Sequence, residues 1–174
     1  MLVAALSFGA WRLAVVREPA SRTARVAIVQ PGIVDNSLTR HSVRELQANL
    51  ERLAREVGAD GGVALAVFPE SAAPRPILEL GEASDRALRA DAAVALAELA
   101  RLARLCGCPA LVGGVALRVG EGRTIVDRRN VVLLFDDEGA LVDRYDKHAL
   151  LALAEHLPGE ATFPWLRSLA PFAG

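Results

Sequence analysis

Short apolar runs that alternate with amphipathic segments constrain the fold of this chain more than any other feature. Arg25–Gln30 and Val63–Phe68 are two such runs, and each is followed at once by a turn that contains proline. Their lack of alternating polar residues is typical of strands that are covered on both faces. Between them, from residue 36 to residue 57, apolar residues recur every three or four positions, which predicts an amphipathic helix that Gly58 ends.

The second half of the chain predicts one further helix and three further strands. Ser84 is a candidate N-cap for an Ala/Leu-rich helix through about Leu105, and Gly107 is a natural end for that helix. Asp136–Gly139 has the composition of a hairpin loop, in which the glycine supplies a positive φ. The element order β-α-β-α-β-β-β therefore predicts an α/β layer structure, with parallel strands first and a hairpin later. The three strands expected here are Ala110–Leu117, Val131–Phe135 and Ala140–Tyr145.

Size and charge exclude several classes of protein. The 174 residues are 52% hydrophobic and 24% charged, which suffices for one domain with a buried core. The net charge of −1 and the interleaving of arginines with acidic residues provide no basic surface for nucleic acid. The two cysteines are separated by a single residue, so they build neither a disulfide framework nor a paired zinc site.

The first 17 residues differ from the rest of the chain. Leu2–Val16 is almost wholly apolar but is shorter than the roughly 20 residues that a membrane-spanning helix requires. It also lacks the basic start and the small-residue cleavage site of a secretory signal. We therefore expect residues 1–17 to be the end of a transmembrane or membrane-associated helix, with an amphipathic lead-in helix as the alternative. Residues 18–24 would then form a linker to a domain that spans residues 25–174.

Glu70 directly follows an expected strand, at a position where ligands gather in open α/β sheets. Its apolar neighbours in Val63–Phe68 would remove water from the carboxylate, which favours the role of a general base. The alternative is an ordinary acid at a strand end that caps a loop amide.

Lys147 stands at the end of another expected strand, Ala140–Tyr145. A lysine there can stabilise the oxyanion of a tetrahedral intermediate, or it can be a surface lysine paired with Asp146 or Asp143. Glu155, eight residues later, is the one charge in an apolar stretch, so it must point to solvent or to a buried partner such as Lys147.

Three further sets of residues carry weaker signals. Cys106 and Cys108 open an expected strand without a histidine close in sequence, which favours small buried side chains over a nucleophile. The spacing of His148 and His156 fits no usual ligand motif and favours solvated or capping histidines over a base or metal pair. Gly113-Gly114 has no phosphate-loop context, so we expect it to permit close packing of the backbone.

The candidate residues stand within longer motifs that follow one another in a fixed order. Arg25-Val26-Ala27-Ile28-Val29-Gln30-Pro31 comes first, Phe68-Pro69-Glu70-Ser71-Ala72-Ala73-Pro74 second, and Arg144-Tyr145-Asp146-Lys147 third, with Glu155 behind it. This order resembles the nitrilase, or carbon–nitrogen hydrolase, superfamily, which uses a Glu–Lys–Cys triad. The Pro-Glu-Ser-Ala-x-Pro form and Asn130 before the strand Val131–Phe135 are similar to the apolipoprotein N-acyltransferase branch in particular.

The resemblance implies a nitrilase-like α-β-β-α layered domain, here incomplete, and a covalent acyl transfer. Glu70 would take the proton of a thiol, Lys147 would stabilise the oxyanion, and Glu155 would hold the lysine charged and oriented. The acyl chain would pass from a phospholipid, through a cysteine thioester, to the N-terminal amine of a diacylglyceryl lipoprotein. The resemblance implies no cofactor and no metal, and it implies a bacterial inner membrane location with this domain facing the periplasm.

The sequence departs from that branch in two ways. Ala152-Leu153-Ala154 stands where the branch has Pro-Phe-Gly, and no cysteine follows Lys147. We therefore expect the 174-residue polypeptide alone to transfer no acyl group. Two alternatives stay open, namely a soluble nitrilase-type amidase of a small carbon–nitrogen substrate and a catalytically inactive nitrilase-like module used for binding.

Overall fold

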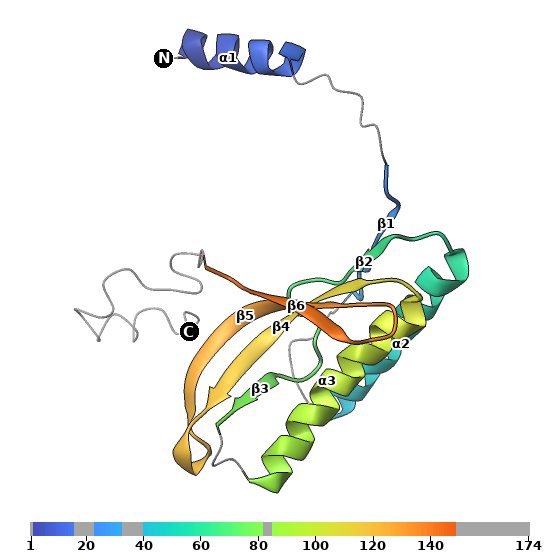
Figure 1. Cartoon of the computed structure of the whole chain (residues 1–174), viewed down its shortest axis with the longest axis vertical. Coiled ribbons are helices and arrows are strands. Elements are labelled where there is room, and N and C mark those ends of the chain that lie inside the picture. Colours follow the sequence, from blue (N-terminus) through green and yellow to red (C-terminus); the bar gives the residue numbers. More distant parts are fainter. Residues whose placement is uncertain (1, 16–22, 33–39, 82–84, 149–174) are drawn as a thin grey trace, which may run out of the picture.

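A six-stranded sheet with two long helices on one face forms the body of the protein (Figure 1). The computed structural model describes residues 2–15, 23–32, 40–81 and 85–148. The helices are α1 (Leu2–Val15), α2 (Arg40–Asp60) and α3 (Arg86–Cys106), with a short 3₁₀ turn at Glu121–Arg123. The strands are β1 (Val26–Ile28), β2 (Leu65–Val67), β3 (Ile77–Leu80), β4 (Ala110–Val119), β5 (Ile125–Phe135) and β6 (Leu141–Asp146).

The sheet has a parallel half and an antiparallel half that meet at β4. Strands β1, β2 and β4 are parallel neighbours, and β3 pairs in parallel with a later part of β4. On its other edge β4 pairs antiparallel with β5, which pairs antiparallel with β6. The predicted α/β class, with parallel strands first and a hairpin later, is confirmed.

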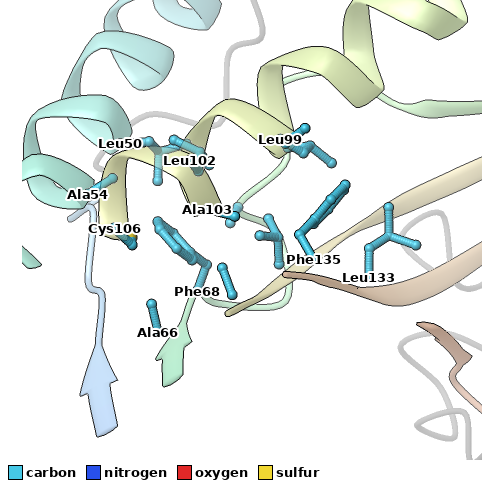
Figure 2. Packing of buried hydrophobic residues seen from close by; sticks show 14 of the residues in the cluster. Leu50, Ala54, Ala66, Phe68, Leu99, Leu102, Ala103, Cys106, Leu133 and Phe135 are labelled. Atoms are coloured by element: carbon cyan, nitrogen blue, oxygen red, sulfur yellow. The ribbon is translucent and has the colours of Figure 1, made fainter. Parts of the chain in front are cut away.

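Both helices pack on the same face of the sheet. The crossovers from β1 to β2 and from β3 to β4 run in one direction across the sheet, and right-handed crossovers then place α2 and α3 on one side. Figure 2 shows the resulting core, in which side chains of the two helices meet those of β2 and β5. Its fully buried members include Leu50, Leu99, Leu102, Leu133 and Phe135.

The opposite face of the sheet is only partly covered by the described residues. On β2, Ala66 is buried against the helices, whereas Leu65 and Val67 on the other face are half-buried. The prediction of strands covered on both faces was wrong for the described part of the chain, because the two helices that follow from the topology share one face.

Two local expectations also differ from the structure. Gly58 does not end α2, which continues to Asp60; instead, a side chain at position 58 would collide with the carbonyl oxygen of Leu105 at the end of α3. The N-cap of α3 is Asp85, whose carboxylate accepts a hydrogen bond from the backbone N–H of Leu88 at 2.9 Å. The predicted end of α3 is confirmed, because Gly107 adopts the left-handed conformation with φ 62°.

Helix α1 presents large apolar side chains to solvent, among them Leu6, Phe8, Trp11 and Leu13. Within the described residues, none of the helices combines the length and the apolar character that crossing a membrane requires.

The face that carries the helices becomes polar towards one end of the sheet. Residues opposite one another in paired strands share a face, and Arg129 lies opposite the buried Ala116 while Asp146 lies opposite the buried Val131. The core therefore continues into charged side chains on the same face.

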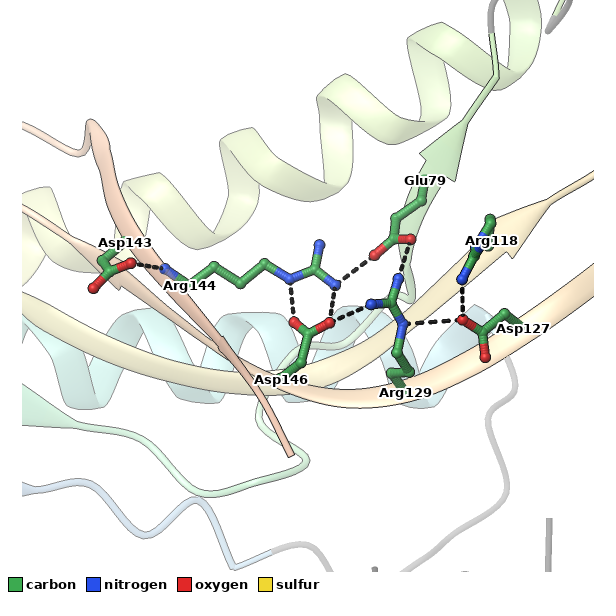
Figure 3. Close-up of polar contacts among 7 residues, drawn as sticks. All are labelled: Glu79, Arg118, Asp127, Arg129, Asp143, Arg144 and Asp146. Carbon is green, nitrogen blue, oxygen red and sulfur yellow. Dashed lines mark hydrogen bonds and ion pairs between the residues drawn. The ribbon is translucent and has the colours of Figure 1, made fainter. Parts of the chain in front are cut away.

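Four of these side chains form a closed ring of alternating charge (Figure 3). Glu79 on β3 contacts Arg129 on β5 and Arg144 on β6, each at 2.5 Å. Asp146 on β6 accepts hydrogen bonds from the same two guanidinium groups. We call Glu79, Arg129, Asp146 and Arg144 the charge ring. Asp127, which pairs with Arg129 and Arg118, extends it along the sheet.

The charge ring predicts an acid-sensitive contribution to stability. The hydrogen bond from Arg144 lowers the pKa of Asp146 below its ordinary value of 3.8, and the charges of Arg144 and Arg129 act in the same direction. A lowered pKa in the folded state stabilises the fold above the pKa of the unfolded chain, and this stabilisation is lost as the pH falls through the lowered pKa. We expect Asp146→Asn to lower the free energy of unfolding at pH 7, and the difference from the wild type to shrink below about pH 4. Urea unfolding at pH 7, 5 and 3 measures this, and a difference that stays constant over the range would contradict it.

Candidate active site

The loop after β2 brings Glu70 against the middle of the sheet. This loop, residues 69–76, runs along the edge of β4 between β2 and β3, which both pair with that edge. The backbone N–H of Phe68 donates to Leu111 at 2.8 Å, and the N–H of Ala73 donates to Gly113 at 2.9 Å. Strand β4 therefore anchors the loop on both sides of Glu70.

Gly113 permits the loop to approach β4 this closely. A Cβ atom at position 113 would lie 2.5 Å from the Cα atom of Glu70 and 2.5 Å from the carbonyl oxygen of Pro69. On the other face of β4, a Cβ atom at position 114 would lie 2.7 Å from the Cβ atom of Ala73. The prediction that Gly113-Gly114 serves close backbone packing is confirmed, and its function is to seat the Glu70 loop.

The structure brings Glu70 and Lys147 together although 77 residues separate them. The Lys147 Nζ atom lies 2.8 Å from Glu70 Oε1, and the Asn130 side chain donates a hydrogen bond to the same oxygen at 3.1 Å. The backbone N–H of Lys147 also donates to the Asn130 carbonyl at 2.9 Å, which continues the ladder of β5 and β6 by one residue. The three side chains thus come from the β2–β3 loop, β5 and the end of β6.

This site lies on the face of the sheet opposite the helices. Asn130 is opposite Val115, and Tyr145 is opposite Val132, so these side chains point away from the core that contains their neighbours Val131 and Leu133. Half-buried apolar side chains of β4 and β5 lie on this face: Leu111, Val115, Val132 and Leu134.

Glu70 is more open than the sequence analysis expected. Its side chain is 54% exposed and that of Lys147 is 31% exposed, whereas a carboxylate enclosed by apolar neighbours was predicted. Of the apolar residues before Glu70, only Ala66 and Phe68 are buried in the core beneath the helices, whereas Leu65 and Val67 on the other face are half-buried. An ion pair this exposed contributes only about 0.2–1 kcal/mol to stability. The fold therefore positions this ion pair, and the ion pair adds little to the stability of the fold.

Among the other candidate residues, those that the structure describes do not join this site. Cys106 and Cys108 are buried thiols in the core, as predicted, and burial raises the pKa of Cys106 to about 12 and also raises the pKa of Cys108. His148 is exposed and makes an edge-on contact with Tyr145, with ring centroids 5.6 Å apart. Glu155 and His156 lie outside the described residues. Within the described part of the chain, no group of three His, Cys, Asp or Glu side chains could hold a metal ion.

One signal in the sequence could have strengthened this site. Lys147 is the only lysine among the 174 residues, and the remaining Lys and Arg positions are all arginine. The family resemblance includes Asn130 before the strand Val131–Phe135, but the contact of Asn130 with Glu70 depends on the pairing of β4 with β5. The lone lysine was readable from the sequence, whereas the role of Asn130 required the tertiary structure.

A mixed sheet with helices on one face and an acid–lysine pair at its strand ends defines a nitrilase-like α/β enzyme domain. The sequence model described as carbon–nitrogen hydrolase matches residues 25–167. Because this match spans most of the chain, the protein belongs to the carbon–nitrogen hydrolase family of the nitrilase superfamily, a family of enzymes. Among curated proteins, none matches the chain.

Solved structures with a similar fold include an amidase from Nesterenkonia sp., with a TM-score of 0.50 and 18% identity over 74% of this chain and 44% of that one. A variant of the amidase from Nesterenkonia sp. AN1 in complex with butyramide has a TM-score of 0.51 and 18% identity over 77% of this chain and 46% of that one. Another variant, which shows covalent addition of the acetamide moiety of fluoroacetamide at the active-site cysteine, has a TM-score of 0.51 at 17% identity. At this identity the similarity shows the fold alone. The chain spans less than half the length of these amidases.

Replacement of Glu70 by glutamine should release Lys147 without unfolding the protein. Competitive acetylation at pH 8 reports this directly, because the side chain of Lys147 and the backbone of Met1 carry the only two primary amines of the chain. Loss of the carboxylate removes the ion pair that holds the Nζ atom, so we expect labelling of Lys147 relative to Met1 to rise roughly 1.5- to 5-fold, as a pair of 0.2–1 kcal/mol implies.

Glu56→Gln is the matched control for this change, since Glu56 is a similarly exposed carboxylate paired with Arg52 on α2. It should leave the labelling ratio unchanged. Equal labelling in the wild type and in Glu70→Gln would mean that the Glu70–Lys147 contact is absent in solution.

Proposed function

We propose that this protein provides the general base and the oxyanion-stabilising group of an acyl-transfer centre that hydrolyses small amides. The observation that carries the proposal is the 2.8 Å contact between Glu70 Oε1 and Lys147 Nζ, which joins two strand ends on one face of the sheet. Membership of the carbon–nitrogen hydrolase family and the fold shared with amidases support the same reaction class.

In this proposal the two side chains divide the chemistry between them. Glu70 takes the proton of a thiol, the thiolate attacks the amide carbonyl, and the ammonium group of Lys147 stabilises the oxyanion that forms. The tetrahedral intermediate then expels the amine, which receives the proton from Glu70, and water activated by the same carboxylate releases the acid from the thioester. Asn130 and Lys147 both donate to Oε1 of Glu70, which assigns the other carboxylate oxygen, Oε2, to the proton transfer. Glu155 is proposed to keep Lys147 charged, as the family resemblance implies.

The thiol in this mechanism is neither of the two cysteines of the chain. Cys106, the last residue of α3, and Cys108 are both buried in the core, and the raised pKa of each thiol disfavours the reactive thiolate. For this reason we propose that the 174 residues alone do not transfer acyl groups.

A thiol placed beside Glu70 tests whether the pair can drive the reaction. Val132 lies opposite Gly113 and Tyr145 on the face of the site, so Val132→Cys puts a thiol next to the carboxylate with little change of volume. We expect this variant to be acylated at position 132 by p-nitrophenyl acetate, at least about tenfold faster than the same variant that also carries Glu70→Gln. Release of p-nitrophenol gives the rate, and mass spectrometry gives the position.

Leu134→Cys is the matched control, because it faces the same side of β5 two residues further from Asn130. It should react slowly and without dependence on Glu70. The proposed chemistry would be wrong if the acylation rate of Val132→Cys were the same with Glu70 and with Gln at position 70.

A second candidate function is apolipoprotein N-acyl transfer, and two observations favour it. The motif from Pro69 to Pro74 resembles that branch, and α1 precedes the domain with exposed apolar side chains. In this candidate the acyl donor is a phospholipid, the acceptor is a diacylglyceryl lipoprotein, and the domain faces the periplasm at the inner membrane.

Vesicle binding separates the two candidates. If the second holds, the chain should sediment with vesicles of phosphatidylethanolamine and phosphatidylglycerol, and replacing the exposed Leu6 and Leu13 by aspartate should weaken this binding at least about tenfold. Ile125→Asp, at an exposed apolar position of the sheet, is the control and should bind as the wild type does. A wild-type chain that stays in the supernatant would exclude this role for α1 and favour the amidase.

A further inference from the structure

Strand β6 carries Lys147 at its end but buries no hydrophobic side chain. All six of its residues are described, and Leu141, Val142 and Tyr145 among them are exposed, while Arg144 and Asp146 are half-buried. Apolar packing therefore does not hold this strand. Its side-chain attachments to the rest of the sheet are polar.

The hairpin loop does not determine the pairing at the Lys147 end either. The β5–β6 pairing shifts register between Leu134 and Phe135, which separates the loop from the remainder of the strand. An irregularity of this kind relaxes the link between the loop geometry and the register beyond it. The end of β6 needs another determinant of its position.

The charge ring contacts β6 at Asp146, the residue next to Lys147. Successive side chains of a strand point to opposite faces, so Asp146 enters the ring on the helix face while Lys147 meets Glu70 on the other face. Glu79 holds the ring from β3, the strand that directly follows the Glu70 loop. The two segments that carry Glu70 and Lys147 are thus tied together a second time, on the far side of the sheet.

The geometry points to the charge ring as the device that positions Lys147, with Glu79, Arg129 and Arg144 acting through Asp146. This inference rests on the proposed role of the Glu70–Lys147 pair. The members of the ring touch neither partner of that pair in any contact described above, so they are positioning residues and not catalytic ones.

Electrostatic interactions favour one register of β6 against β5. If β6 slipped by one residue, Arg144 and Asp146 would both leave the helix face, so that Asp146 would lie on the face of Glu70 and Lys147 would lie on the helix face beside Arg129. Both faces would then bring like charges together. In the observed register each charge of the ring has two partners of opposite sign, and Lys147 has the carboxylate of Glu70.

The contacts of Glu79 with two arginines explain why the position of Lys147 depends on the whole charge ring and not on a single ion pair. Glu79 is 22% exposed and bridges two arginines from neighbouring strands. Its removal leaves Asp146 as the one carboxylate shared by both guanidinium groups, while Asp127 pairs with only one of the two, that of Arg129. Repulsion between the two guanidinium groups is relieved when the end of β6 moves, and Lys147 moves with it.

Competitive acetylation of Lys147 in Glu79→Gln tests this inference under conditions where circular dichroism shows a folded chain. We expect labelling relative to the Met1 α-amine to rise to the level of Glu70→Gln, by roughly 1.5- to 5-fold. In the double variant Glu70→Gln/Glu79→Gln, the labelling of Lys147 should not rise further, because the carboxylate of Glu70 with which the positioned Lys147 pairs is already absent.

Glu51→Gln is the control for a purely structural effect. Glu51 is 18% exposed and also pairs with two arginines, but it lies on α2, where it contacts Arg55 of the same helix and Arg101 of α3. It should lower the unfolding midpoint comparably and leave the labelling of Lys147 unchanged. A Glu79→Gln variant that is destabilised but labelled like the wild type would overturn the inference, since the ring would then stabilise the fold alone.

If Glu79→Gln does not fold, Glu79→Asp provides the same comparison, because its shorter carboxylate keeps the charge but reaches one arginine less well. A smaller rise in labelling is then expected, and no rise overturns the inference. The acylation of Val132→Cys is independent of this readout. Suppose that Glu79→Gln raises the labelling of Lys147, but that the acylation of Val132→Cys does not depend on Glu70. The positioning role of the charge ring would then stand, and the proposed function would be refuted.

Discussion

An ion pair as exposed as Glu70 and Lys147 is worth at most about 1 kcal/mol and cannot bring two strand ends together. The backbone must therefore place each partner separately. Glu70 is placed by the loop that lies against Gly113, where the absence of a side chain allows contact with the backbone of β4. Lys147 is placed by the ladder between β5 and β6, which reaches Asn130 through a backbone hydrogen bond.

The two faces of the sheet divide structural and chemical tasks. One face holds the apolar core beneath α2 and α3 and continues into the charge ring, and the other face holds the pair among half-buried aliphatic residues. The two faces also differ in the cationic side chain that they use, which is arginine in the charge ring and lysine in the pair with Glu70. Every ion pair described apart from that of Lys147 uses arginine, whose planar fork can bridge two carboxylates as it does in the ring. The compact ammonium of the lone lysine is a point charge that suits a small developing negative charge.

Much of the fold could be predicted because apolar periodicity and strand ends are local properties. The helices, the hairpin and the positions of Glu70 and Lys147 after strands all followed from such patterns. Strand β3 was missed because Ile77–Leu80 is four residues long and follows Pro76, so it has too little pattern to stand out. Gly58 was misinterpreted as a helix end because its role depends on α3, which is distant in sequence and passes within contact distance.

The sequence by itself determined the alternation of strands and helices, the single lysine and the order of the motifs, since these depend only on neighbours along the chain. Only the tertiary structure decided that the β2–β3 loop and the end of β6 meet on one face, that Asn130 joins them and that Asp146 turns to the other side. Those facts depend on strand order and register, in which a shift of one residue exchanges the two faces of a strand. Side-chain periodicity limits the possible registers, and contacts between segments far apart in sequence select the one that is formed.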